Sequence, residues 1–374
     1  MTVKKAKVID LFSGVGGLSL GAALAGFELT AAVEIDPHAL YAHSTNFPRT
    51  VHIAKSVSEI GKEILDDLSV KKGELSGLIG GPPCQGFSYI GKRNIDDLRN
   101  CLFSEFFRIV SLFRPKFFLA ENVPGILCDK YAQVRDSAFS HVEKDYTILP
   151  PIVASAHEYG APTTRTRVVF IGFLKNEMPT LSETLFLPSS DAAHVRVKQA
   201  LTGLPREIDP EWQTQEDGWQ KLSGRIQGTY PQKINDRIPH GVGNEYAIKQ
   251  LKNYRRISGC FGTRHSEEIL RRFAEIRPGE KDKISKSVRL VEDGFCPTLR
   301  AGTGKEHGSF QAVRPLHPTE NRVITPREAA RLQGFPDWFQ FSPTKWHSFR
   351  QIGNSVSPIL AEYFLSVLYD NFHK

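Results

Sequence analysis

Short apolar runs alternate with longer amphipathic stretches from the start of the chain to about residue 175. The apolar runs predict buried strands at residues 8–12, 29–33, 75–79, 117–120 and 168–173. Helical patterns follow the first two runs: one opens at a glycine-rich turn, and the other covers residues 38 to about 46. Strands that alternate with helices are typical of a parallel sheet covered on both faces. We therefore expect an α/β fold in this part of the chain.

The pattern changes between about residues 180 and 300. Polar residues, glycine and proline occur there without a regular alternation of strands and helices, and a basic run covers residues 249–256. A helical pattern returns at Thr325-Pro326-Arg327-Glu328, an order typical of a helix N-terminus, and a last amphipathic stretch covers residues 358–369. We predict a first domain over residues 1–178, a smaller irregular domain over 179–322, and a return to the first domain over 323–374.

Composition and charge place the chain among ordinary globular proteins. Its 374 residues suggest two or three compact units at roughly 100–200 residues each. The 48 Lys and Arg exceed the 41 Asp and Glu by seven, a modest surplus that permits a polyanionic partner without establishing one. No apolar run approaches the roughly 18–20 residues of a membrane span, and the pattern of a secretory leader is missing. We therefore expect a cytoplasmic protein without a membrane partner.

The cysteine pattern bears on possible metal sites and disulfides. The five cysteines are odd in number, widely spaced and without a CxxC pair. This spacing argues against a disulfide framework and against a zinc ribbon. We expect no metal site, and the pattern leaves room for one reactive thiol.

A glycine-rich turn follows the first predicted strand, with Gly14, Gly16 and Gly17 at the start of a helix. Glycines there let a ligand approach bare backbone at the positive end of the helix. Glu34 follows Gly14 by 20 residues, the spacing at which a carboxylate accepts hydrogen bonds from ribose hydroxyls. The pattern predicts an adenosine-containing ligand and leaves NAD and S-adenosylmethionine both open. A plain strand–turn–helix with a surface acid is the simpler alternative.

Two groups capable of chemistry follow later strands. Cys84 comes after the run Gly80-Gly81-Pro82-Pro83, which fixes a rigid loop where open α/β sheets bind their ligands. A packing cysteine more often lies within an apolar run, so we interpret Cys84 as a nucleophile. Glu121 follows the strand at 117–120, and Val123 and Pro124 after it shape an apolar pocket. A carboxyl in such a pocket can donate a hydrogen bond or a proton.

With these motifs the sequence resembles the DNA (cytosine-5)-methyltransferases of bacterial type II restriction-modification systems. One such motif is a weak signal, whereas six in the family's order along nearly the whole chain are a specific one. The resemblance implies a Rossmann-like domain that binds S-adenosylmethionine, a smaller target-recognition domain, and double-stranded DNA held between them. It rests on the motifs Phe12-Ser13-Gly14-Val15-Gly16, Glu34, Pro83-Cys84-Gln85, Glu121-Asn122-Val123, Arg165-Thr166-Arg167 and Gly353-Asn354-Ser355-Val356.

The resemblance also implies a role for each residue. Cys84 would add to carbon 6 of a cytosine extruded from the DNA, which makes carbon 5 nucleophilic. Glu121 would meet ring nitrogen 3 of the base, as an acid or as a hydrogen-bond donor. Arg165 would approach the carbonyl oxygen of the base, and Arg167 would help to hold the Cys84 loop. The residues implied to bind S-adenosylmethionine are Phe12, Ser13, Gly14, Gly16, Gly17, Glu34, Leu102, Asn354, Ser355 and Val356.

Two positions depart from the family pattern. Ser56 stands where many members have an aspartate beside the adenine, and Thr163 stands where the family often has a glutamine. Neither change removes Cys84 or Glu121, so we still expect an active enzyme.

The stretch between the arginine pair and Thr325 should recognise the target, and guanidinium groups suit the edges of guanine. It contains Arg255, Arg256, Arg264, His265, Arg271, Arg272 and Arg300. Arg271 and Arg272 lie in a helical pattern that favours a solvated or phosphate-facing surface, and for Arg300 a surface turn is the alternative to a DNA contact.

We expect a monomeric enzyme that methylates carbon 5 of a cytosine in a specific double-stranded DNA sequence. This modification would protect the DNA from a cognate restriction endonuclease, without a stable complex between the two proteins. A tRNA cytosine-5 methyltransferase is the alternative within the same chemistry. A DNA-binding protein without catalysis would leave Cys84 and Glu121 unused, and a nicotinamide dehydrogenase would leave the Cys84 motif unused.

Overall fold

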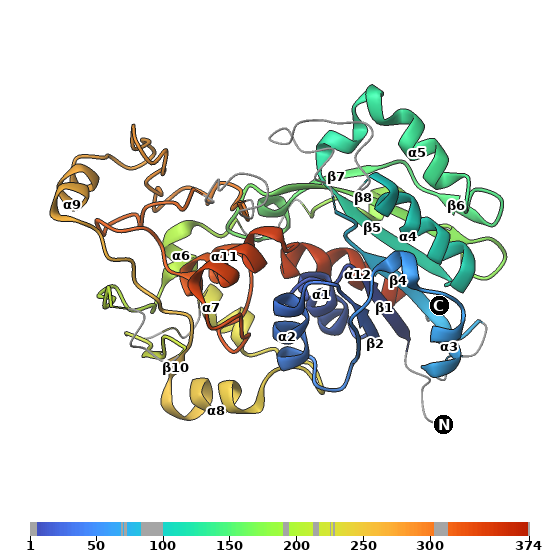
Figure 1. Cartoon of the computed structure of the whole chain (residues 1–374), viewed down its shortest axis with the longest axis horizontal. Coiled ribbons are helices and arrows are strands. Elements are labelled where there is room, and N and C mark those ends of the chain that lie inside the picture. Colours follow the sequence, from blue (N-terminus) through green and yellow to red (C-terminus); the bar gives the residue numbers. More distant parts are fainter. Residues whose placement is uncertain are drawn as a thin grey trace.

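The computed structural model describes residues 6–68, 70, 73–83, 100–189, 194–211, 217–224, 226, 229–302 and 313–372. In this part of the chain, eight strands form one sheet in the order β3-β2-β1-β4-β5-β8-β6, and β7 also pairs with β8 (Figure 1). The strands are β1 Lys7–Leu11, β2 Glu28–Val33, β3 Val51–Ile53, β4 Leu75–Gly80, β5 Phe117–Asn122, β6 Tyr146–Ile148, β7 Ile152–Ser155 and β8 Thr166–Leu174.

The sheet is mixed rather than parallel. The strands from β3 to β5 are parallel to their neighbours, as the alternating pattern predicts. β8 is antiparallel to β5, and β6 and β7 are antiparallel to β8. The prediction of a further parallel strand at 168–173 is therefore wrong in direction. The sequence pattern missed the short strands β6 and β7, and only the short helix η4 (Ala156–Tyr159) separates β7 from β8, too short a connection for a parallel crossover.

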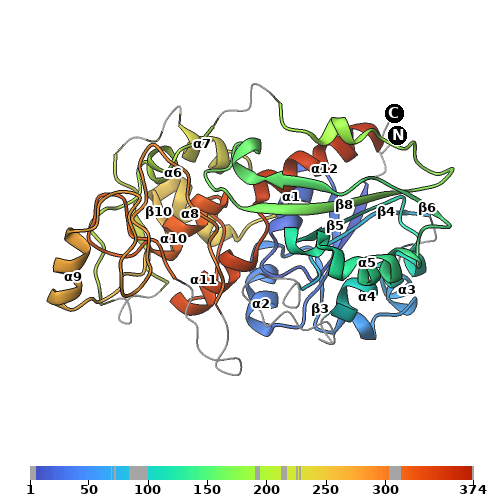
Figure 2. The ribbon, with the colours of Figure 1, turned by 90° about the horizontal axis from the view of Figure 1, so that it is seen from above.

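Helices cover both faces of the sheet (Figure 2). The helices around it are α1 Gly17–Ala25, α2 Pro37–Asn46, α3 Glu63–Asp67, α4 Asn100–Phe113, α5 Ala132–Phe139 and α12 Pro358–Phe372. α1 and α12 pack against each other on one face, in a core that contains Val8, Leu119 and Phe364. α4 and α5 cover the other face, in a core that contains Ile9 and Phe106. Because Val8 and Ile9 are neighbours on β1, their separation into two cores shows a strand buried on both faces.

The elements α6 to α11, which we call the second lobe, lie beside the sheet (left in Figure 1). They are α6 Val197–Leu201, β9 Gln220–Lys221, α7 Tyr230–Asn235, α8 Glu245–Tyr254, β10 Arg256–Ile257, α9 Glu267–Ala274, α10 Pro326–Gln333 and α11 Lys345–Asn354. The other 3-10 helices of the described residues are η1 Val57–Glu59, η2 Pro124–Leu127, η3 Asp129–Tyr131 and η5 Glu183–Phe186. The predicted start of α10 is confirmed, since Thr325 and Glu328 form a capping box. The domain borders at 178 and 322 stay predictions.

Buried arginines of α10 hold the second lobe together. Arg331 forms a bidentate pair with Asp337, both fully buried, and Arg331 also donates to the carbonyl of Ala200 at 3.2 Å. Arg327 donates to the carbonyl and hydroxyl oxygens of Ser258 at 2.8 and 3.1 Å. Such buried charges are tolerated because every charge has a partner. No helix among the described residues has both the length and the apolar composition needed to cross a bilayer.

Candidate active site

The glycine-rich turn joins β1 to α1 at one edge of the sheet. Its backbone has positive φ at Phe12 (57°), Gly14 (56°) and Gly16 (100°). A Cβ on Gly17, the first residue of α1, would collide with the segment 355–356. Glycine at this position therefore allows the C-terminal motif to approach the turn. Predicted cofactor residues from the two ends of the chain are brought together here.

The turn offers both space and an unused polar atom. A Cβ on Gly14 would meet nothing within 4 Å. The hydroxyl of Ser13 is buried and has no hydrogen-bond partner among the described residues. In the C-terminal motif, Asn354 is exposed, whereas Ser355 and Val356, which follow it, are buried. Open backbone and an orphan hydroxyl at a helix N-terminus suit a polar ligand, so the residues present fit an adenosine-containing cofactor.

Glu34, at the end of β2, fixes the turn. Its Oε2 accepts the backbone N–H of Gly14 at 2.8 Å, and its Oε1 accepts those of Ile35 and Asp36 at 2.8 Å each. Burial raises the pKa of Glu34, while these three N–H donors act in the opposite direction. The spacing of 20 residues between Gly14 and Glu34 thus reflects a direct contact, in addition to any contact with ribose.

A buried polar chain lies beneath the turn, and sequence reasoning missed it. Ser19 on α1 donates to Oδ2 of Asp10 at 2.5 Å and lies 3.0 Å from Nε2 of His43, whose Nδ1 is 2.8 Å from Nε2 of His52. Burial raises the pKa of Asp10 to about 7 and lowers that of His43 well below its usual value. The one sequence signal for this buried polar chain was Asp10, an aspartate inside an apolar strand.

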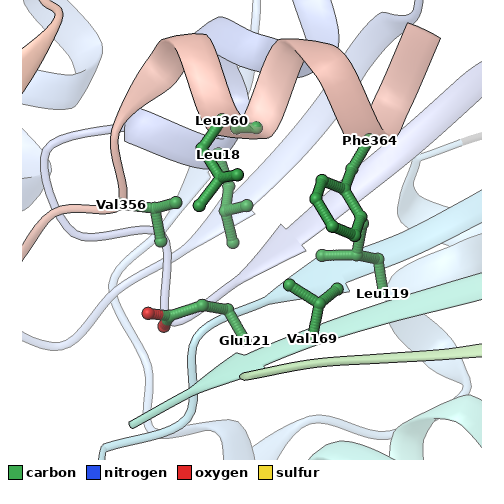
Figure 3. A pocket seen from close by; sticks show the side chains of 8 residues that line it. Leu18, Leu119, Glu121, Val169, Val356, Leu360 and Phe364 are labelled. Carbon is green, nitrogen blue, oxygen red and sulfur yellow. The ribbon is translucent and has the colours of Figure 1, made fainter. Parts of the chain in front are cut away.

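Glu121 lies at the carboxyl end of β5 and pairs with Arg167 at the start of β8. Nε of Arg167 is 2.5 Å from Oε1 of Glu121, and both side chains are largely buried. Behind the carboxyl is an apolar void of about 10 Å³, at the lower limit for one water. Figure 3 shows its lining, with Leu119 and Val169 on the strands and Leu360 and Phe364 on α12, beside Leu18 and Val356. The carboxyl therefore has a dry wall on one side.

Arg165, directly before β8, links that strand to the second lobe and to the motif before α12. Its guanidinium is almost fully buried and donates to the carbonyls of Leu299 at 3.2 Å and Asn354 at 3.3 Å. The roles that the resemblance implies for Arg165 and Arg167 stay predictions. The guanidinium of Arg167 lies beside the Glu121 carboxyl. The partners of Arg165 are 134 and 189 residues away in sequence, so spacing could not identify them.

Cys84 lies outside the described residues. The described start of its loop, Gly81 and Pro82, lies beside Glu121. A Cβ on Gly81 would be 3.0 Å from Oε2 of Glu121, and Asn122 donates to the carbonyl of Pro82 at 3.4 Å. The chain thus leaves β4 directly next to the carboxyl.

Two predicted cofactor residues and the two positions that depart from the family pattern also lie among the described residues. Phe12 is half-buried against the core under α4, and Leu102 is a half-buried residue of α4 itself. Ser56 caps η1, and its hydroxyl lies 2.7 Å from that of Ser58. Thr163 is fully buried and forms a parallel bridge with residue 296 of the second lobe. None of these contacts tests a role in cofactor binding.

The candidate DNA-reading arginines differ in how they are engaged. Three of them form ion pairs inside the second lobe: Arg264 with Glu211, Arg271 with Glu267, and Arg272 with Asp282. Arg255 has a left-handed backbone and donates to the carbonyl of Gly224. Arg256 and Arg300 are exposed. Arg255, Arg264 and Arg271 are exposed as well, so their contacts do not remove them from solvent.

Comparison with known proteins gives a consistent family. A family described as C-5 cytosine-specific DNA methylase matches residues 6–369. The type II methyltransferase M.XorII of Xanthomonas oryzae pv. oryzae is 40% identical over 364 residues, covering 94% of this chain and 82% of that protein. The type II methyltransferase M.DdeI of Desulfomicrobium norvegicum is 32% identical, covering 95% of this chain and 86% of that protein.

Solved structures of methyltransferases have folds similar to that of this chain. The crystal structure of an Escherichia coli DNA modification methyltransferase encoded within a prophage has a TM-score of 0.89 and 51% identity, and covers 99% of this chain and 100% of that chain. The Dnmt2 methyltransferase of S. pombe has a TM-score of 0.62 with 18% identity, covering 98% and 99% of the two chains, and supports the fold alone.

Proposed function

The chain belongs to the C-5 cytosine-specific DNA methylase family, and from this premise we propose how its residues carry out the reaction. The protein is a type II DNA (cytosine-5-)-methyltransferase that uses S-adenosylmethionine as methyl donor. We further propose that it acts as a monomer on a specific double-stranded sequence. Its methylation would protect that sequence from a partner restriction endonuclease, with which it forms no stable complex.

The turn after β1 and the motif before α12 hold the cofactor. When bound, S-adenosylmethionine supplies an electrophilic methyl group for carbon 5 of the cytosine. The open backbone at Gly14 and the orphan hydroxyl of Ser13 face this ligand, and Asn354 belongs to the motif that closes on the turn. Each carboxylate oxygen has two lone pairs, so Oε2 of Glu34, which accepts one N–H, retains capacity for a ribose hydroxyl.

Cys84 and Glu121 act on the pyrimidine ring. The thiolate of Cys84 forms a bond to carbon 6, and the electron pair displaced from the ring double bond makes carbon 5 nucleophilic. Glu121 donates to ring nitrogen 3, and Arg167 holds the Glu121 carboxyl and faces the charge that builds up on the ring. Once carbon 5 carries the methyl group, it loses its proton to a water molecule, the double bond between carbons 5 and 6 re-forms, and the Cys84 thiolate leaves. Because the attack needs both faces of the ring, the cytosine must leave the stack.

One observation carries this proposal: the Glu121 carboxyl lies against Arg167 on one side and against the start of the Cys84 loop at Gly81 on the other. The acid, the cation and the start of the loop that leads to Cys84 thus lie together at the ends of β4, β5 and β8. The dry wall behind Glu121 strengthens each polar interaction made there.

The test uses the full-length protein with isotopically labelled S-adenosylmethionine and either DNA or tRNA, followed by sequencing for 5-methylcytosine. We expect label in DNA only, and we expect Cys84→Ser to abolish transfer while cofactor binding persists. DNA with 5-fluorocytosine at the target should trap a covalent adduct with the native protein and none with Cys84→Ser. Label in RNA only would overturn the assignment of DNA as the substrate. Methyl transfer by Cys84→Ser would overturn the role of Cys84 as the nucleophile.

A further inference from the structure

A continuous chain of four polar side chains lies beneath the glycine turn. Oδ2 of Asp10 is 2.5 Å from Oγ of Ser19, which lies 3.0 Å from Nε2 of His43. Nδ1 of His43 is 2.8 Å from Nε2 of His52. Asp10, Ser19 and His43 are fully buried, whereas His52 is half-buried on β3, the first strand in the sheet order. This polar chain therefore runs from the interior below the turn to the edge of the described sheet.

Each contact of the polar chain can be made in either direction, because a hydroxyl and a neutral imidazole both donate and accept. In one arrangement Asp10 carries a proton on Oδ2 and donates to Ser19, and Ser19 donates to Nε2 of His43. The Nδ1–H of His43 then donates to Nε2 of His52. In the reverse arrangement Asp10 is a carboxylate, and every donor points toward it. The distances fit both arrangements, and His43 changes only the nitrogen that carries its proton.

The surroundings of Asp10 favour its protonated form. Its Oδ1 is buried without a hydrogen-bond partner among the described residues, so a carboxylate would have one oxygen uncompensated. Burial and, less strongly, the charge of Glu34 raise the pKa of Asp10 to about 7. Burial also keeps His43 neutral, because it lowers the pKa of that imidazole well below its usual value. The polar chain thus holds a proton at its buried end and no cation beside it.

Glu34 shows that Asp10 responds to charge at the cofactor turn. Glu34 accepts the backbone N–H of Gly14 within that turn, and its negative charge acts to raise the pKa of Asp10. A positive charge at the same place must act in the opposite direction. The cofactor turn is therefore a place from which a cation can drive the proton off Asp10.

Other titratable groups around the polar chain do not change this balance. α1 and β4, which adjoin Asp10, contain none. Besides His43, those of β2, α2 and α12 are Glu28, His38, Tyr41, Glu362, Tyr363, Tyr369 and Asp370. Of the charged groups in the described ranges, Glu34 acts on Asp10, and His52 acts on His43. Burial lowers the pKa of His52, against a contact with the backbone of Thr50. A cation at the turn would therefore add positive charge where the described residues place a negative one.

We propose that Asp10 releases a proton to solvent through this polar chain when the cationic S-adenosylmethionine occupies the turn. The inference rests on the proposed function, because it requires that cofactor at the turn. The proton of Asp10 passes to Ser19 as Ser19 passes its own proton to Nε2 of His43. His43 gives its Nδ1 proton to Nε2 of His52, and His52 gives its Nδ1 proton to water. Asp10 is left as a carboxylate, and the other three groups stay neutral.

This proton release makes cofactor selection depend on pH. The sulfur of S-adenosylmethionine is positively charged, whereas that of the demethylated product, S-adenosylhomocysteine, is neutral, so Asp10 keeps its proton beside the product. The same steps in reverse return a proton to Asp10 after methyl transfer. The affinity for S-adenosylmethionine relative to S-adenosylhomocysteine should therefore rise with pH up to about 7 and level off above it.

A first experiment counts the protons released on cofactor binding. Calorimetric titration of the full-length protein at about pH 6, in two buffers that differ in ionisation enthalpy, gives this number. With S-adenosylmethionine the native protein should release about one proton more than Asp10→Asn, because Asp10 is largely protonated at this pH. With S-adenosylhomocysteine the two proteins should release equal numbers. Asp66→Asn, the matched control on the exposed surface of α3, should behave as the native protein does.

A second experiment follows the polar chain itself. Nitrogen NMR of the protein with labelled histidine shows which ring nitrogen carries the proton, and His43→Gln and His52→Gln assign the two signals. When S-adenosylmethionine is added to the native protein, the proton of His43 should move from Nδ1 to Nε2. In Ser19→Ala, which interrupts the chain between Asp10 and His43, the proton should stay on the same nitrogen.

Three results would overturn the inference. Equal proton counts in the native protein and Asp10→Asn would exclude Asp10 as the source of the proton. Equal release with S-adenosylmethionine and S-adenosylhomocysteine would exclude the charge as its cause, and proton release without a change at His43 would exclude the polar chain as its route. If Asp10→Asn does not fold, the NMR comparison of the native protein with Ser19→Ala is decisive alone. Failure of the proposed function is distinct, since the native protein would then bind S-adenosylmethionine and methylate no DNA.

Discussion

Nε of Arg167 lies 2.5 Å from Oε1 of Glu121, where the ends of β8 and β5 adjoin. Arg165, two residues earlier, donates to carbonyls of the second lobe and of the motif before α12. The contacts described for the two arginines of one short motif thus differ. In the proposed reaction Arg167 acts at the base, whereas Arg165 joins distant parts of the chain. Each role predicts a different consequence of substitution.

Arg167→Gln should lower kcat by about 10²-fold, because it removes a cation aimed at the charge that develops on the ring. The affinity for S-adenosylmethionine should stay within about twofold of the native value, since no predicted cofactor residue in the described ranges forms a hydrogen bond or an ion pair with Arg167. Single-turnover methylation and equilibrium cofactor binding measure the two quantities. An unchanged single-turnover rate would contradict the assignment of Arg167 to the base.

Arg165→Met should act on stability rather than on chemistry. The substitution keeps much of the side-chain volume but leaves the buried carbonyl of Leu299 without its donor, at a cost of about 2 kcal/mol in the free energy of unfolding. Arg167→Gln should cost less than about 1 kcal/mol by the same measurement, chemical denaturation at one temperature. A loss of kcat in Arg165→Met without a loss of stability would instead assign Arg165 a role at the base.

Glu34→Gln should weaken S-adenosylmethionine binding by about tenfold. The Glu34 carboxylate accepts three backbone N–H groups, whereas a glutamine has one oxygen and would turn its NH₂ toward one of those donors. The turn at Gly14 would lose its anchor. Calorimetric titration of the cofactor measures the effect, with Glu59→Gln, the exposed acid that caps η1, as the control. Equal cofactor affinity in Glu34→Gln and the native protein would show that cofactor binding does not depend on Glu34 as an anchor of the turn.

The strands that carry the site were predictable, because each is an apolar run that ends in a polar or glycine-rich motif. The ends of β4 and β5 place Gly81 and Glu121 next to each other for this reason. The direction of β8 was not predictable, since β6 and β7 have only three and four residues and weak alternation. Whether Cys84 occupies the predicted position stays a prediction, because it lies outside the described residues.

The second lobe could be predicted only as a region of irregular structure. Its stability depends on contacts between distant residues, such as the bond from Arg331 to the carbonyl of Ala200, 131 positions away. No local period reports such contacts. The same holds for the buried chain under the glycine turn: Asp10 stood out inside an apolar strand, but its link through Ser19 to His43 depends on the packing of α1 against α2.

The carboxyl of Asp10 makes the stability of the protein depend on pH. Burial raises its pKa from 3.8 to about 7, with a further contribution from Glu34. Between these values the folded state keeps a proton that the unfolded chain has released. The stabilisation by that proton is complete below pH 3.8 and is lost as the pH rises to about 7, at a total cost of about 4 kcal/mol.

Asp10→Asn removes this titration while it preserves the shape of the protonated acid and an acceptor for Ser19. Its stability relative to the native protein should therefore increase between about pH 4 and pH 7 and change no further above pH 7. His43 and His52 have lowered pKa values and change stability in the opposite direction at lower pH, but both proteins contain them, so the difference isolates Asp10. Chemical denaturation across this range measures it, with Asp66→Asn, an exposed acid of α3, as the control. A difference between Asp10→Asn and the native protein that does not vary with pH would show that Asp10 is ionised in the folded state throughout.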